Sequence, residues 1–403
     1  MRFCLLGPAH PFRGGIAHYN TMLWRALSRR HDTSFVSMRR QYPDFLFPGT
    51  TQHDASKEAF RVDDEPLLIP TSPPTWKRTA DRVIEIAPDL AILPWWHPYF
   101  GPAFGSVAKR LTRAGIRTCF LCHNGKAHES GLLDGWLTRY AFRTVDRFVA
   151  HSEGDAGAIR QVRPQARIRV SPHPTYDCFR NEDPRPASVE RESLGLTDRP
   201  TLLFFGYVRR YKGLPVLLRA MPRILERHDC QLAVVGEFYH EEDETRALIR
   251  ELGLESRVRI EGRYVPNEEV ARWFGAADAV VLPYRSASQS GIVQIAFGFD
   301  KPVVATRVGG LPEAVTEGRT GFLADPDDPS SLADAIERLF AADASELRKG
   351  IRAERDRFSW DRMVETLESL ARDETEPIST PESSDPAPTT VDTNVGAGDT
   401  LVG

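Results

Sequence analysis

The feature that most constrains the fold is a regular alternation of short β-type runs with longer amphipathic stretches along the 403 residues. In the first half, strands are expected at residues 2–7, 33–38, 90–96, 116–122, 147–152 and 168–172. Helical patterns lie between them, near 16–30, 75–87, 102–114, 131–145 and 153–162. Alternating strands and helices are typical of a parallel sheet that helices cover on both faces.

The same alternation begins again after a polar, proline-containing stretch at 181–200, which is typical of a connection between domains. Strands are then expected at 201–206, 231–236, 257–262, 279–284 and 302–306. Helices are expected at 213–227, 242–252, 267–276, 291–299, 329–341 and 358–371. We therefore predict an α/β protein with two tandem Rossmann-like, doubly wound domains. Ligands of such sheets bind outside the carboxyl ends of the strands, in the cleft.

Composition narrows the class of protein. The chain is 41% hydrophobic and 27% charged, and its net charge of -4 argues against a dedicated nucleic-acid binder. From residue 373 onward there are seven acidic residues and no Lys or Arg, so we expect a disordered acidic tail at 373–403. No apolar run approaches the ~18 residues of a membrane span, and no secretory signal is seen. Five cysteines suit a reducing, cytoplasmic compartment.

Basic clusters occur in the first half, at Arg29-Arg30, Arg39-Arg40, Lys109-Arg110 and Arg139/Arg143/Arg147. The simpler interpretation is solvated helix faces. The alternative is a weak attraction to anionic ligands or anionic lipid, with peripheral contact to the inner face of the membrane.

One string suggests a cofactor. Cys119-Phe120-Leu121-Cys122-His123 matches the C-x-x-C-H attachment signal of c-type haem. However, the string lies in a β-type run, where side chains alternate between faces, so Cys119 and Cys122 should diverge. No second Cys/His pair has zinc-ligand spacing. We therefore expect no haem and no metal, and His123 becomes a residue at the carboxyl end of a strand.

Three strand ends of the first half carry candidate site residues. Gly14-Gly15 precedes a helix whose amides could hold an anion, although a tight turn alone would also explain the pair. Trp96 follows a strand and could form an acceptor platform, or simply pack. His123 could hydrogen-bond a sugar hydroxyl or assist proton transfer, with His128 and Glu129 nearby on the acceptor side.

Two strand ends of the second half favour a phosphate ligand. Gly206, Arg209, Arg210 and Lys212 lie on a turn before a helix, and such cations suit a diphosphate as ligand and leaving group. Exposed basic turn residues are the plainer alternative. Ser288, Ser290, Gly291 and Ile292 form an uncharged turn and helix start that also fits phosphate.

Taken in order, these stretches resemble family-four (group 1) glycosyltransferases of the GT-B fold. The matching stretches are "GGIAHYN", "GYVRRYKGL", "VVGE", "IEGRYVPNEEV", "ADAVVLPY" and "KPVVATRVGGLPEAVTEGRTGFLADPDD". The resemblance implies an acceptor-side domain at 1–176, completed by the crossing helix 358–371, and a nucleotide-sugar-binding domain at 177–357. It also implies a cleft between them, retaining transfer and no catalytic metal.

The resemblance also carries roles onto single positions. Lys212 matches the lysine on the donor diphosphate, but Tyr207 stands where an arginine usually follows the glycine, so Arg209 or Arg210 must supply that charge. Arg263 and Tyr264 lie where the family holds the base, His123 matches an active-site histidine, and Gly15 matches the glycine loop near the diphosphate.

The main departure concerns two glutamates that the family has eight positions apart. Ala287 and Ile295 occupy those positions. We hypothesise that the Gln294 amide oxygen accepts from the ribose hydroxyls, and that Ser288 and Ser290 take sugar and phosphate contacts.

We therefore expect a hexosyltransferase that uses a nucleotide-sugar co-substrate and a saccharide or lipid-linked acceptor in surface polysaccharide or glycolipid synthesis. The alternative is a non-catalytic sugar-nucleotide or glycolipid-binding subunit of the same fold.

Overall fold

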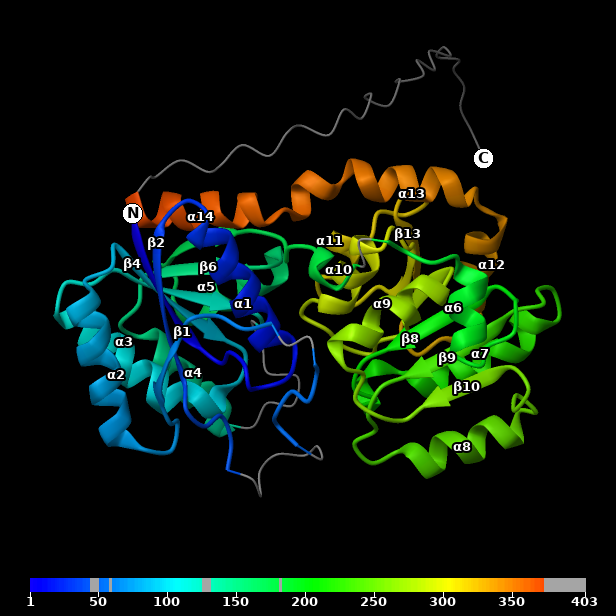
Figure 1. Ribbon diagram of the computed structural model, residues 1–403, viewed down its shortest axis with the longest axis horizontal. Helices are drawn as coiled ribbons and strands as arrows, with labels where there is room; N and C mark the ends of the chain where they lie inside the picture. The colour runs from blue at the N-terminus through cyan, green and yellow to red at the C-terminus, as the bar shows by residue number, and fades with distance from the viewer. Residues whose placement is uncertain (44–50, 58–59, 125–131, 181–182, 373–403) are drawn as a thin grey trace, which may run out of the picture.

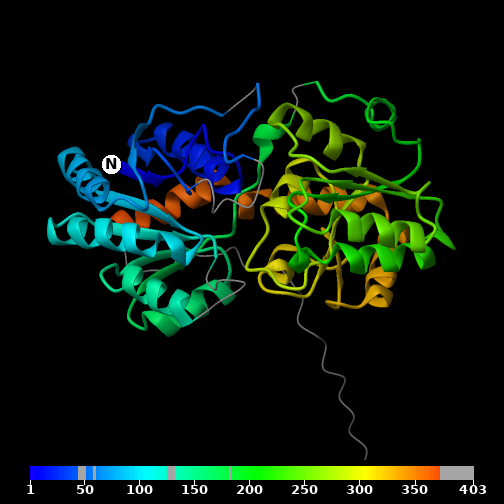
Figure 2. The ribbon, with the colours of Figure 1, turned by 90° about the horizontal axis from the view of Figure 1, so that it is seen from below.

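Two parallel sheets stand side by side in the computed structural model, which describes residues 1–43, 51–57, 60–124, 132–180 and 183–372 (Figures 1 and 2). The predicted α/β architecture of two tandem, doubly wound sheets is confirmed. The expected tail at 373–403 lies outside the described residues, as do His128 and Glu129.

The first sheet has seven strands in the order β3-β2-β1-β4-β5-β6-β7, with every pair parallel. Its strands are β1 (Arg2–Gly7), β2 (Asp32–Met38), β3 (Glu65–Leu68), β4 (Leu90–Trp95), β5 (Thr118–Cys122), β6 (Arg147–Ala150) and β7 (Arg167–Val170). Its helices are α1 (Gly15–Ser28), α2 (Pro73–Ile86), α3 (Gly101–Arg113), α4 (Leu132–Phe142) and α5 (Glu153–Val162).

The second sheet has six parallel strands in the order β10-β9-β8-β11-β12-β13. Its strands are β8 (Thr201–Phe205), β9 (Gln231–Val235), β10 (Val258–Glu261), β11 (Ala279–Leu282), β12 (Val303–Thr306) and β13 (Gly321–Ala324). Its main helices are α6 (Ala187–Ser193), α7 (Leu214–Leu225), α8 (Glu242–Glu251), α9 (Asn267–Ala276), α10 (Gly291–Gly298), α11 (Leu311–Ala314), α12 (Pro329–Ala341) and α13 (Ala344–Ala353). The strand patterns in the sequence do not predict β3 or β13, which are short edge strands.

Three apolar clusters explain how the layers are held. One face of the first sheet packs against α2, α3, α4 and α5, and one face of the second packs against α7, α8 and α12. The third cluster joins the remaining faces of both sheets and includes residues of α1, α9 and α10. Because this cluster runs from one half to the other, the two halves share a continuous core.

The last helix, α14 (Trp360–Arg372), packs on α1 of the first half, to which the chain returns after the short turn η5 (Arg355–Phe358) (Figure 1). Glu368 of α14 contacts His31 at 2.7 Å and Arg30 at 3.0 Å. Arg147 at the start of β6 donates to the Leu370 carbonyl at 3.3 Å. The chain therefore passes between the halves twice, once after β7 and once through η5.

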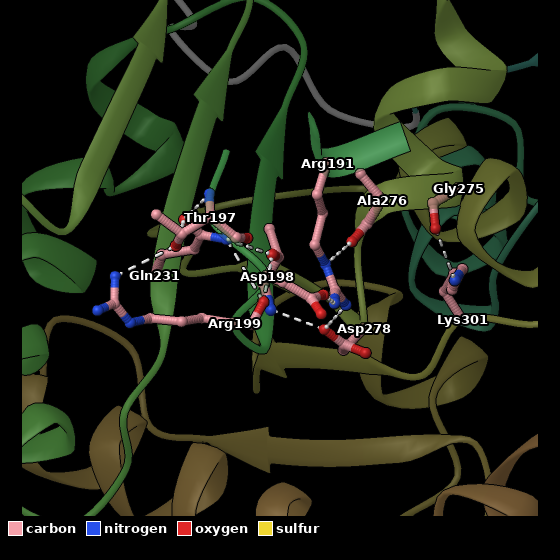
Figure 3. Close-up of polar contacts among 10 residues, drawn as sticks. Arg191, Thr197, Asp198, Arg199, Gln231, Gly275, Ala276, Asp278 and Lys301 are labelled. Atoms are coloured by element: carbon pink, nitrogen blue, oxygen red, sulfur yellow. Dashed lines mark hydrogen bonds and ion pairs between the residues drawn. The ribbon is translucent and has the colours of Figure 1, made fainter. Parts of the chain in front are cut away.

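A polar network at the amino ends of β8, β9 and β11 fixes α6 to the second sheet (Figure 3). Arg191 of α6 donates to the Ala276 carbonyl at 3.1 Å and to Asp278 at 2.7 Å, and Asp278 also accepts from the Thr201 backbone amide at 2.7 Å. Lys301 donates to the Ala277 carbonyl at 2.7 Å. These contacts lie at the end of the sheet away from the cleft, so they organise the second half and leave its carboxyl edge for ligands.

Candidate functional site

A cavity of about 230 Å³ lies between the two halves, at the carboxyl ends of their strands. Several residues from the sequence motifs line it, namely Gly14, Gly15, His123, Gly206, Lys212, Tyr264, Gly291 and Ile292. Segments more than two hundred residues apart thus meet at one place. The strand-end rule predicts that these residues come together, and they line one cavity, although the rule says nothing of what each residue does.

Lys212 is the buried cation of this cavity. It ends the short turn η4 (Arg210–Lys212), and its side chain lies against the open face of Gly206, with Nζ 5.6 Å from the centre of the Tyr284 ring. Burial, and secondly the charge of Arg209, lower the pKa of Lys212 to about 7. Among the described residues no carboxylate pairs with it, so an anion entering the cavity would meet an uncompensated ammonium group.

Gly213 sets the position of Lys212. Its φ of 68° is in the left-handed region, and a Cβ atom there would lie 1.9 Å from the Pro283 carbonyl oxygen. Only glycine can make this turn at this distance from the strand β11. The turn therefore brings the lysine beside the segment that leads to α10.

The three arginines that the sequence assigns to the donor do not line this cavity. Arg209 is exposed and stacks over the Tyr239 ring at 4.1 Å, while Arg210 contacts Glu241 at 3.1 Å. Arg263 is held by Glu261 at 2.7 Å and by Glu269. Arg209 still acts on Lys212 through its charge, but in this arrangement Lys212 is the cation that a ligand would contact directly.

The start of α10 supplies uncharged donors. Ser290 caps the helix by accepting from the Ile292 amide at 3.2 Å, and Gly291 and Ile292 then line the cavity. Ser288 lies just before this cap and donates to the His123 carbonyl at 3.2 Å and to Asn124 at 2.6 Å. Ser288 therefore joins the two halves by hydrogen bonds, which the sequence does not predict.

Gln294 is not brought to this cavity. On α10, Ile292 and Ile295 face the cavity with Lys212, whereas Ser290 and Gln294, four residues apart, line a second cavity. The side-chain period of a helix separates these two sets. The hypothesis that Gln294 reaches the donor ribose therefore has no support from its position here.

Three histidines surround Tyr19 of α1, and each follows one of three neighbouring strands. His123 follows β5, His151 follows β6 and His173 follows β7, with ring centres 4.5, 5.4 and 4.9 Å from that of Tyr19. All are buried, and burial lowers the pKa of His151 to about 4 and of His173 to about 3. The pKa of His123 lies well below its ordinary value for the same reason. The three rings are therefore neutral near pH 7.

Arg13 and Glu237, which no sequence motif singles out, form a buried ion pair between the halves beside the cavity. The Arg13 Nη2 atom donates to the Glu237 Oε2 atom at 2.7 Å, with the two side chains 2% and 9% exposed. The Arg13 guanidinium also stacks over Tyr264 at 4.8 Å and Tyr207 at 5.6 Å. The sequence does hold a signal for both residues: Arg13 stands directly before Gly14-Gly15, and Glu237 stands directly after Gly236 at the end of a strand.

On the acceptor side, only Trp96 is described. Its Nε1 donates to the Tyr42 hydroxyl at 3.3 Å and its ring packs on Phe100, with 4.2 Å between ring centres. Its carbonyl accepts from Asn124 at 2.9 Å. Trp96 is thus a packed, partly buried residue beside the site.

The two cysteines of the haem-like string lie on opposite faces of β5. Cys119 packs in the core shared by the two halves, and Cys122 packs in the cluster under α2 to α5. Burial raises the pKa of the Cys119 thiol to about 12 and that of Cys122 well above its ordinary value. Both thiols therefore behave as small apolar residues of the core.

Within the part of the chain that is described, no three His, Cys, Asp or Glu side chains are grouped so that they could hold a metal ion. No described helix has both the length and the apolar character that a bilayer span requires.

Comparisons with known proteins agree with this architecture. A family model described as Glycosyltransferase Family 4 matches residues 13–175, and one described as Glycosyl transferases group 1 matches residues 199–342. The D-inositol 3-phosphate glycosyltransferase of Corynebacterium jeikeium is 36% identical over 211 residues, which are 50% of each chain. The D-inositol 3-phosphate glycosyltransferase 1 of Catenulispora acidiphila is 34% identical over 244 residues, which are 57% of each chain. The chain thus spans about half the length of these curated relatives.

Solved structures show the same fold over nearly the whole chain. Sucrose-phosphate synthase from Thermosynechococcus elongatus has a TM-score of 0.66 at 20% identity, covering 93% of this chain and 99% of that one. Anabaena HepE in complex with UDP-glucose has a TM-score of 0.68 at 19% identity, covering 92% and 99%. The two matched family models and these folds show that the chain is a GT-B protein that belongs to the group 1 glycosyltransferases.

Proposed function

We propose that this protein is a retaining glycosyltransferase that binds a nucleotide-sugar in the cavity with Lys212 and transfers a hexose-type sugar to a saccharide or lipid-linked acceptor. The observation that carries the proposal is Lys212 itself. A lysine that is 7% exposed, with its pKa lowered to about 7, faces a glycine-rich wall and the start of α10. Burying a cation in this way is unfavourable unless an anionic ligand completes the site.

The relatives support the kind of donor. HepE has been captured with UDP, with UDP and glucose, and with UDP-glucose, and the curated relatives are named as glycosyltransferases. In this chain, a donor diphosphate would lie against Lys212, the open faces of Gly14 and Gly15, and the start of α10 at Gly291. These groups carry positive charge or N–H dipoles, which stabilise the charge that grows on a leaving diphosphate.

The reaction we envisage is dissociative. The bond between the sugar and the diphosphate breaks first, and the acceptor hydroxyl attacks from the same face, which retains the anomeric configuration. The acceptor proton passes to the departing phosphate oxygen. His123, neutral and buried at the cavity wall, holds a sugar hydroxyl rather than serving as a charged acid.

The acceptor side is proposed to include Trp96, together with His128 and Glu129. Helix α4 offers a means to reach a lipid-linked acceptor, since Leu133 and Trp136 are 66% and 60% exposed on it. Arg139 and Arg143 lie on the same helix and just beyond it. Apolar side chains beside cations suit peripheral contact with an anionic membrane surface, and surface polysaccharide or glycolipid synthesis in the cytoplasm is the setting we propose.

The competing function is a non-catalytic subunit that binds a sugar-nucleotide or glycolipid. The residues Ala287 and Ile295, in place of the family's two glutamates, favour it. A donor panel separates the two. The protein is incubated with UDP-, GDP- and ADP-sugars, with and without lipid-linked saccharides, and free nucleotide is measured.

Release of nucleotide from one donor, lost in Lys212→Met, is the expected result. The matched control is Lys301→Met, which removes a partly buried lysine that donates to the Gly275 and Ala277 carbonyls of its own half. A donor that binds without any turnover in the wild-type protein would instead establish the non-catalytic subunit.

A further inference from the structure

A second cavity, of about 420 Å³, lies between the halves on the side of η5 and α14. The ends of β6 and β7 and helix α5 form one wall, and α10 and α11 form the other. Only His173 and Gln289, of the described residues, line both this cavity and the one with Lys212. We call it the hinge cavity, because the chain crosses between the halves beside it.

Arginine is the prevailing charged residue of the hinge cavity. Four arginines line it, from both halves and from the crossing helix: Arg160, Arg169, Arg357 and Arg362. Glu153 and Glu313 are the two acids, and they are engaged locally: Glu313 accepts from the Glu153 backbone amide at 3.0 Å, and Glu153 lies 3.7 Å from Arg160. The lining therefore carries more positive than negative charge.

Arg362 of α14 is the clearest candidate to bind an anion. It is partly buried, and within the described residues its guanidinium has no carboxylate or carbonyl to donate to. Arg357, by comparison, donates to the Glu313 carbonyl at 2.5 Å and stacks over Phe358 at 5.0 Å. A guanidinium with free donors at a cavity wall suits a phosphate or a carboxylate.

Two buried side chains at the same cavity each have an acceptor atom to which no group donates a hydrogen bond. His151 is 5% exposed, and its Nδ1 atom donates to the Ser171 carbonyl at 2.9 Å, so Nε2 is the acceptor of a neutral ring, and it has no partner. The Gln294 Oε1 atom, in a side chain 2% exposed, is also without a partner. Buried acceptors left unpaired are costly, so they indicate that a donor group belongs there.

We propose that the hinge cavity is a second ligand site, for a small molecule that carries both an anionic group and hydroxyl groups, namely a phosphorylated monosaccharide. The phosphate contacts Arg362 and the neighbouring arginines, and the sugar hydroxyls donate to His151 and Gln294. A cavity of this volume is in the range that holds such molecules. Because its walls come from both halves, the ligand favours the arrangement in which the halves are close, and so strengthens binding in the neighbouring cavity.

The test is calorimetric titration of the whole protein with three probes: glucose 6-phosphate, inorganic phosphate and glucose. We expect glucose 6-phosphate to bind at least about tenfold more tightly than either fragment, since only it uses both sets of groups. Arg362→Gln should weaken it about tenfold, and His151→Phe should also weaken it. Arg348→Gln, which alters an exposed arginine on α13 outside the cavity, should leave binding unchanged.

The same titration in saturating UDP, GDP or ADP, whichever the protein binds best, separates this site from the cavity with Lys212. Binding of glucose 6-phosphate should persist there and become tighter. The proposal is overturned if the sugar phosphate competes with the nucleotide, binds no better than inorganic phosphate, or is unaffected by Arg362→Gln in a variant that keeps the wild-type melting temperature. Failure of the donor panel would leave the three-probe titration and the effect of Arg362→Gln standing, since neither of these needs a nucleotide.

Discussion

The Arg13 guanidinium and the Glu237 carboxylate connect the two halves of the protein by a 2.7 Å contact from which water is almost fully excluded. Arg13 belongs to the loop after β1, and Glu237 follows β9. The contact is a buried ion pair, because the exposed fractions of the two side chains are 2% and 9%. The pair therefore adds a buried ion pair to the shared apolar core and the Ser288 hydrogen bonds that join the halves.

Replacing both residues of this pair should destabilise the protein much less than the sum of the two single substitutions. Arg13→Met and Glu237→Gln should each lower the free energy of unfolding by about 3 kcal/mol, because each breaks this buried ion pair. The double variant should recover at least about 2 kcal/mol of that sum. Urea unfolding of the four proteins measures the coupling, and additive losses would show that the pair is not an energetic unit.

Lys212 should lower the free energy of unfolding of the protein, although it favours binding of a nucleotide. Its pKa falls from 10.5 to about 7 on folding, so the unfolded chain holds a proton that the folded protein releases between these values. The resulting loss of folding stability is absent above pH 10.5 and grows as the pH falls towards 7. Lys212→Met should therefore raise the free energy of unfolding by roughly 1–3 kcal/mol at pH 7, and by less at pH 9.5.

In the same variant, nucleotide binding should lose its pH dependence. In the wild-type protein, affinity for the preferred nucleoside diphosphate should weaken as the pH rises above 7, because the lysine is then neutral. Lys212→Met should bind weakly at every pH, whereas Lys301→Met should keep the wild-type profile. A wild-type profile in Lys212→Met would remove this lysine from the diphosphate site.

The three buried histidines should make the protein sensitive to acid. Below pH 6.5 their unfolded forms take up protons that the folded protein excludes, so stability falls as the pH falls towards about 4. His151→Gln should reduce the slope of stability against pH by up to roughly 1.4 kcal/mol per pH unit in this window, since one proton is removed. The glutamine amide can still donate to the Ser171 carbonyl.

Chemical unfolding at several pH values between 4 and 7 provides the measurement for this histidine. His240→Gln, at an exposed position, is the control and should follow the wild-type curve. Equal slopes in the wild-type protein and in His151→Gln would contradict the account.

The exposed face of α4 should contribute to membrane contact. Replacing Leu133 and Trp136 by serine should lower binding to vesicles that contain phosphatidylglycerol by about tenfold, since the apolar area available for insertion is lost. Val189→Ser, at an exposed apolar residue of the second half, is the control. Co-sedimentation measures both, and equal binding of all three proteins would remove α4 from the contact.

Much of the architecture can be predicted from strand and helix periods, because buried parallel strands are apolar runs between turn residues. The edge strands β3 and β13 escape this reasoning, because β3 contains Pro66 and β13 begins at Gly321 directly after a turn. The Lys212 turn is predictable because a strand end and a helix start coincide there.

Side-chain direction is the part that the sequence leaves open. Arg209 and Arg263 stand beside the site in the sequence, but an aromatic ring and two glutamates hold them away from it. Gln294 is one residue from Ile295, and that single step on α10 turns it to the other cavity. The Arg13–Glu237 contact depends on how the two sheets meet, which no local sequence pattern encodes.

The double passage of the chain between the halves has a consequence for proteolysis. One cut in the connection around Pro184 would leave the second passage, through η5 into α14, intact. The nicked protein should therefore separate into two fragments under denaturing conditions. Under native conditions it should remain one particle, because α14 of the second fragment stays packed on α1 of the first.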